Sequence, residues 1–154
     1  MCRVSVLFYR SDSWLSRLIR RVTRAQFSHV GIGMPDRLTL FEALGSGIVI
    51  REGLAYFKRR DEAVAMVKIT VSEGDYAQML LFLNRRIDRK YGFINFIAAG
   101  INVLFPRLPL VMSDGRKYIC SGLVAEALCK GDFDFDEPAL MTPGDLAREL
   151  GVKE

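Results

Sequence analysis

Residues 27–33 read Phe-Ser-His-Val-Gly-Ile-Gly, a short apolar run that contains the only histidine of the chain, His29. Because side chains alternate across a β-strand, Val30 and Ile32 would share one face, and His29 and Gly31 the other. We therefore predict a strand that packs Val30 and Ile32 into a core. Its opposite face would carry an imidazole beside a glycine, which leaves open surface next to the ring.

The segments around this run predict an α+β domain, because strands and one helix come first and further helices follow. Gly-containing turns and the pair Pro35-Asp36 separate the strands. Ser72 and Thr142 are the N-cap residues expected to begin two of the helices. The predicted elements are strands at 4–9, 29–33, 38–43, 47–51 and 64–71, a charged loop at 58–62, helices at 72–86, 93–104, 120–130 and from Pro143 onward, and a loop at 106–117.

Length and composition indicate one globular domain over residues 1–154. Half of the chain is apolar and 26% is charged, which is wrong for a disordered protein. The longest uncharged apolar-rich stretch, residues 94–105, is shorter than the ~20 residues that a membrane-spanning helix needs. The amino terminus shows no secretory signal pattern. We expect a cytoplasmic protein by default, and export by a signal-independent route stays open.

The three cysteines, Cys2, Cys120 and Cys129, are odd in number and lack metal-ligand spacing. They therefore indicate neither a disulfide framework nor a zinc site. We expect free thiols, and neither a metal nor another cofactor.

Cys120 is predicted at the start of a helix, where unpaired backbone N–H groups and the helix dipole favour a negative charge. Such a position lowers the pKa of a thiol, and the thiolate is the nucleophilic form. Leu123 and Val124 mark the buried side of this helix, so the thiol would face the core or the base of a cleft. Ser121 and Gly122 keep the first turn small enough for a substrate to approach. The alternative is a buried, inert cysteine.

His29 is the only imidazole available as a general acid or base for such a thiolate. Glu42, on the next predicted strand, would come beside His29 in an antiparallel pair that turns at Pro35-Asp36. There it would orient the imidazole and stabilise its charged form. The alternatives are a solvated strand histidine and an ordinary surface glutamate.

Positive charge is concentrated at the amino terminus, where residues 1–30 hold six arginines against one aspartate. Residues 14–24 predict an amphipathic helix with Trp14, Leu15, Leu18, Ile19 and Val22 on one face and arginines on the remainder. Such a helix either packs its apolar face on the sheet or lies on an anionic membrane. The chain has no recognisable nucleic-acid-binding motif, so we expect no nucleic-acid partner.

Two segments resemble a known superfamily. Cys-Ser-Gly-Leu-Val at 120–124 is similar to the nucleophile motif of NlpC-type cell-wall peptidases, and Ser-His-Val-Gly-Ile at 28–32 resembles their histidine strand. The histidine precedes the cysteine here, as in the circularly permuted branch that includes YiiX-like proteins and the lecithin–retinol acyltransferase group. The opening of the chain, through residues 24–32, resembles the YiiX-like side. Glu42 matches the place of the third polar residue in that group.

The resemblance implies a permuted papain-like fold, in which an antiparallel sheet packs against helices and the nucleophile Cys120 lies at a helix N-terminus. It implies a cysteine hydrolase in which Cys120 attacks an amide or ester, His29 transfers the proton and Glu42 orients His29. Peptide or peptidoglycan-like substrates are favoured. Acyl-lipid transfer or hydrolysis at a membrane surface, and a non-catalytic binding module, are the alternatives. Candidates for substrate or oxyanion contacts are Tyr9, Tyr118 and Ser121.

Overall fold

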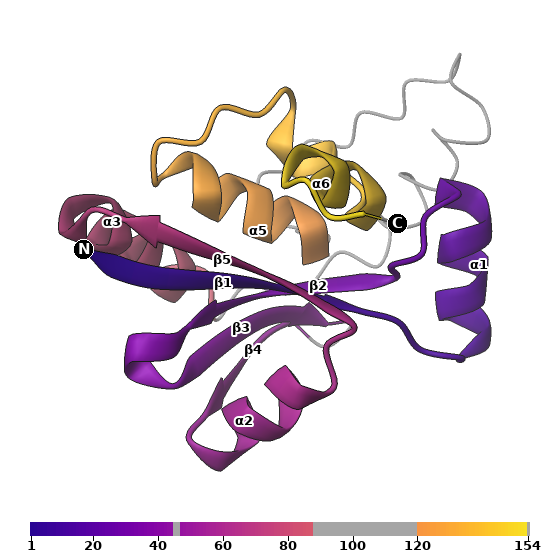
Figure 1. Cartoon of the computed structure of the whole chain (residues 1–154), viewed down its shortest axis with the longest axis horizontal. Helices are drawn as coiled ribbons and strands as arrows, with labels where there is room; N and C mark the ends of the chain where they lie inside the picture. The colour runs from indigo at the N-terminus through magenta and orange to yellow at the C-terminus, as the bar shows by residue number, and fades with distance from the viewer. Residues whose placement is uncertain (45–46, 88–119, 154) are drawn as a thin grey trace.

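A computed structural model describes residues 1–44, 47–87 and 120–153 and shows an α+β arrangement (Figure 1). Within these ranges, five strands form one antiparallel sheet in the order β4-β3-β2-β1-β5. The strands are β1 (Cys2–Tyr9), β2 (His29–Met34), β3 (Thr39–Leu44), β4 (Gly47–Glu52) and β5 (Ala65–Val71).

Two helices begin at the capping residues predicted from the sequence. Ser72 accepts a hydrogen bond from the Asp75 N–H, and Thr142 forms a complete capping box with Asp145, as predicted. The helices of the described ranges are α1 (Trp14–Thr23), α2 (Leu54–Asp61), α3 (Glu73–Asn84), α5 (Cys120–Cys129) and α6 (Pro143–Glu149), with 3-10 turns at Pro35–Arg37 and Pro138–Leu140.

The main core lies between one face of the sheet and helices α3, α5 and α6 (Figure 1). Val30 and Ile32 are fully buried in it, which confirms the predicted alternation of β2. The helices contribute fully buried side chains such as Leu123 and Leu128 from α5, and Leu146 from α6. Since α5 contacts both β2 and β3, this core holds the Cys120 helix against the strand that carries His29.

The opposite face of the sheet packs against α2 in a second, smaller apolar cluster. Tyr56 of α2 is 2% exposed and packs with Leu7, Tyr9 and Leu40. The charged loop predicted at 58–62 is therefore wrong, because its residues to Asp61 form the last turns of α2. Lysine and arginine are good helix formers, and the buried Tyr56 fixes the helix on the sheet.

One contact between α1 and the rest of the protein is made by a buried serine. The Ser16 hydroxyl donates to the Ser28 hydroxyl over 2.5 Å in a buried contact. Trp14 and Leu18, by contrast, are 73% and 47% exposed. The interpretation in which the apolar face of this helix packs on the sheet is wrong for these two residues, since Ser16 occupies the side that faces the protein.

Some expectations concern residues outside the described ranges: the helix at 93–104, the loop at 106–117 and Tyr118. None of the helices in the ranges that the structure describes combines the length and apolar character needed to cross a membrane.

The anchoring role of Tyr56 is testable by truncation. Tyr56→Ala removes a buried ring and is expected to lower the free energy of unfolding by about 3 kcal/mol in urea unfolding. Leu54→Ala is the matched control on the same helix, because Leu54 is 86% exposed, and it should change stability by less than about 0.5 kcal/mol. Equal effects of the two variants would contradict this account of α2.

Candidate active site

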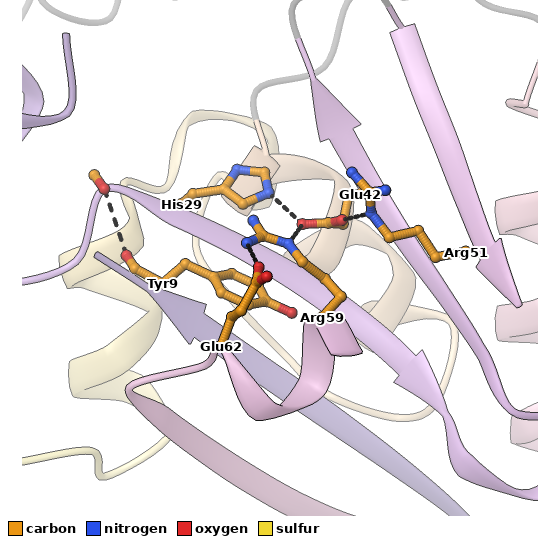
Figure 2. Close-up of polar contacts among 7 residues, drawn as sticks. Tyr9, His29, Glu42, Arg51, Arg59 and Glu62 are labelled. Carbon is orange, nitrogen blue, oxygen red and sulfur yellow. Dashed lines mark hydrogen bonds and ion pairs between the residues drawn. The ribbon is translucent and has the colours of Figure 1, made fainter. Parts of the chain in front are cut away.

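His29 and Glu42 come together because β2 and β3 pair in an antiparallel register that places Gly31 opposite Glu42. His29 lies two residues from Gly31 and so projects from the same face of the sheet. Its Nε2 is 2.9 Å from Glu42 Oε1 (Figure 2). Because Glu42 engages Nε2, Nδ1 is left for a second partner.

Glu42 is a fully buried carboxylate with two further donors (Figure 2). Arg51 Nε lies 2.6 Å from its Oε2, and Arg59 Nε lies 2.9 Å from its Oε1. Burial alone would raise the pKa of Glu42, but the hydrogen bonds from His29 and Arg51 and the charges of His29 and Arg59 outweigh it. The result is a pKa of about 2, so Glu42 is an anion at any physiological pH.

Cys120 reaches His29 where β2 and β3 part. Their pairing extends only to Gly31 opposite Glu42. The Phe8 carbonyl accepts a hydrogen bond from the Val64 N–H, so the polar groups of Phe8 point towards β5. Val30 is paired with Phe8 across β1 and β2 without hydrogen bonds between the two residues, and the Val30 N–H therefore points away from β1. The Cys120 thiol lies there, where the Val30 N–H and the Ser121 N–H donate to it and His29 contacts it.

Cys120 and His29 favour each other's charged forms. Burial would raise the pKa of the Cys120 thiol, but the hydrogen bond and charge of His29 and the two backbone N–H groups lower it. Burial would likewise lower the pKa of His29. The hydrogen bonds and charges of Cys120 and Glu42 overcome this effect and raise the pKa to about 9. Each of the two groups therefore makes the charged form of the other less costly in this buried site.

Two of the residues predicted to contact a substrate or an oxyanion lie in the described ranges, and both are buried. Tyr9 is buried, and the centroid of its ring lies 3.8 Å from the Arg59 guanidinium and 5.6 Å from the centroid of the His29 ring. The Ser121 hydroxyl is buried and donates to the Met141 carbonyl over 2.5 Å, so only its backbone N–H faces the thiol. Tyr118 lies outside the described residues.

Sequence reasoning missed Arg51 and Arg59, which hold Glu42 in place. Arg51 pairs with Leu40 across β3 and β4, two residues from Glu42 on the same face, so strand alternation alone contained the signal. Arg59 could not be found while residues 58–62 were assigned to a loop. Its second contact, Arg59 Nη1 to Glu62 Oε2 at 2.8 Å, fixes the guanidinium over Tyr9 (Figure 2).

The described residues contain no cluster of three or more histidine, cysteine, aspartate or glutamate side chains placed to bind a metal. Comparison with models of known protein families and with curated proteins finds no match for this chain. A functional proposal therefore depends on the chemistry of Cys120, His29 and Glu42.

The charge of Glu42 predicts a pH-dependent loss of stability. Its pKa of about 2 in the folded protein lies below the ordinary 4.5, so its stabilising contribution is complete above pH 4.5 and is lost as the pH falls towards 2. Glu42→Gln cannot titrate. Urea unfolding should show the stability difference between wild type and Glu42→Gln shrinking over this window, by up to about 3 kcal/mol. Parallel stability curves for the two proteins would contradict the assignment.

Gly31 gives a second test, because a Cβ built there would lie 3.1 Å from Glu42 Cγ and 3.0 Å from Leu40 Cδ1. Gly31→Ala should push the Glu42 side chain away from His29 and lower the pKa of His29. Since His29 is the only histidine, its ring protons can be titrated by NMR without assignment. Gly33→Ala is the matched control, because its Cβ would meet Leu7 and Tyr56 instead. An equal pKa change in both variants would contradict the role of Gly31.

Proposed function

We propose that this protein is a cysteine-dependent hydrolase that cleaves an amide or ester bond through a thioester intermediate. One observation carries the proposal: a thiol in contact with an imidazole whose other nitrogen is held by a buried, ionised carboxylate. A nucleophile, a base in reach of it and a third group that orients the base are the parts of a catalytic triad.

Each residue has one role in the reaction. The Cys120 thiolate attacks the substrate carbonyl carbon and forms a tetrahedral intermediate. The His29 imidazolium then gives its proton to the leaving nitrogen or oxygen, and the C–N or C–O bond breaks to leave a Cys120 thioester. In the second step, neutral His29 takes a proton from water as the water attacks the thioester. The acid product leaves, and the thiolate–imidazolium pair is restored. Glu42 holds the ring orientation throughout.

We further propose that the fold is the permuted papain-like fold and that Cys120 lies at the N-terminus of its helix. One observation supports the position of Cys120: the Ser121 backbone N–H donates to the thiol, as an N–H of the first helical turn is free to do. The reversed order of histidine and cysteine is no obstacle, because a catalytic triad is defined by geometry and roles rather than by chain order.

Among substrates, a peptide or peptidoglycan-like amide is the class we favour, because the Cys-Ser-Gly-Leu-Val segment at 120–124 resembles the peptidase motif. Acyl-lipid transfer or hydrolysis is the second candidate. Its specific support is the exposure of Trp14 and Leu18 on the basic helix α1, which suits a membrane surface. A non-catalytic module with the same arrangement is the outcome that remains if the thiol is activated but forms no acyl-enzyme.

The pH dependence of thiol alkylation tests the activated cysteine. In a Cys2→Ser, Cys129→Ser background, only Cys120 reacts with iodoacetamide. We expect its rate to reach a plateau well below pH ~8.5, the pKa of a free thiol. His29→Ala should move the midpoint upward and slow alkylation near neutral pH by about tenfold or more. A midpoint at the free-thiol value that His29→Ala does not change would rule out the pair.

In the same background, mass spectrometry after addition of p-nitrophenyl acetate should detect acetyl transfer to Cys120. Acetylation should be absent in Cys120→Ser.

A further inference from the structure

α1 (Trp14–Thr23) presents an outward side that mixes apolar and basic residues. Trp14 and Leu18 are 73% and 47% exposed, and Arg17 and Arg21 are exposed beside them. Residues at spacings of three, four and seven share one side of a helix, so these four side chains form a single surface. We call Trp14, Arg17, Leu18 and Arg21 the outward face of α1.

The position of α1 explains why this face is turned away from the protein. Ser16, on the opposite side of the helix, is buried and bonded to Ser28. In Figure 1, α1 stands at one end of the sheet, apart from α3, α5 and α6.

The charged residues of α1 and its flanking segments are predominantly basic. Arg10 and Arg24 are exposed at the two ends of α1, in addition to Arg17 and Arg21. The one acid of residues 1–30, Asp12, lies 3.7 Å from Arg20. Arg20 is half-buried and also donates to the Ser11 carbonyl. A partner for this surface therefore needs negative charge together with a place for an indole ring.

We propose that the outward face of α1 binds the surface of an anionic lipid membrane. The headgroup region offers phosphate groups to arginine side chains, and the boundary below it takes up tryptophan and leucine. A membrane meets both needs without a shape that matches this small face. A folded acidic protein would instead have to supply an apolar pocket within a negatively charged surface.

Binding in this way would bring the candidate site to the membrane. Ser28, the buried partner of α1, directly precedes His29 in the chain. The orientation of α1 on a bilayer therefore fixes the orientation of the Cys120–His29 pair. The inference stands independently of the proposed hydrolase, because membrane binding needs neither the thiol nor the imidazole.

Trp14 is the only tryptophan of the chain, so its fluorescence reports on this face alone. Vesicles of equal amounts of phosphatidylcholine and phosphatidylserine should shift its emission to shorter wavelength. Pure phosphatidylcholine vesicles should cause little or no shift, and added salt should reverse the shift. An unchanged emission with the phosphatidylserine vesicles would overturn the proposal. So would co-sedimentation with these vesicles while the Trp14 emission stays that of an exposed ring.

Charge reversal on the outward face of α1 is the second test of membrane binding. Arg17→Glu with Arg21→Glu should weaken co-sedimentation with these vesicles by about 25-fold or more, since each basic residue near the surface contributes about fivefold. Lys68→Glu with Lys130→Glu is the matched control, because it changes net charge equally at exposed positions on β5 and just after α5. An equal loss in both double variants would show only a response to net charge and would overturn the assignment to α1.

Discussion

The site is organised by a carboxylate that has no access to water. Removing an ion from water costs several kcal/mol unless it is paired and hydrogen-bonded. Glu42 meets this condition through His29, Arg51 and Arg59, which lie 2.6 to 2.9 Å from its two oxygens. These partners belong to β2, β4 and α2, so the charge of one side chain fixes three elements relative to β3. His29 is held in place because Glu42 cannot stay buried without its donors.

The charge on His29 compensates the thiolate as well as the carboxylate when the thiol is ionised. Glu42 and the Cys120 thiolate are buried anions, and His29 interacts with both. A buried ion with an oppositely charged partner avoids the large cost of an uncompensated charge. The hydrogen bond and charge of His29, together with two backbone N–H groups, therefore give a cysteine that is only 6% exposed a lowered pKa, although burial alone would raise it.

Local patterns predicted the parts of the fold that local physics determines. Alternation identified β2 and its buried face, and the pairing of β2 with β3 brought Glu42 to His29 as expected. The helix at residues 54–61 was missed because its anchor, Tyr56, is buried by Leu7, Tyr9 and Leu40. These contacts are distant in sequence, and a charged segment gives no local sign of them. The exposure of Trp14 could not be predicted for the same reason, because it depends on the contact of Ser16, on the other side of α1, with the distant Ser28.

The Cys120 thiol lies at the point where β2 and β3 separate, and this separation frees a hydrogen-bond donor for it. If the ladder continued past Gly31, the Val30 N–H would be used in a strand–strand hydrogen bond. Because pairing stops there, that N–H is available to the Cys120 thiol. The paired stretch holds the orienting carboxylate, and the unpaired stretch supplies a donor to the nucleophile. One strand therefore presents the base and a thiolate-stabilising dipole on successive residues, which a straight, fully paired hairpin could not do.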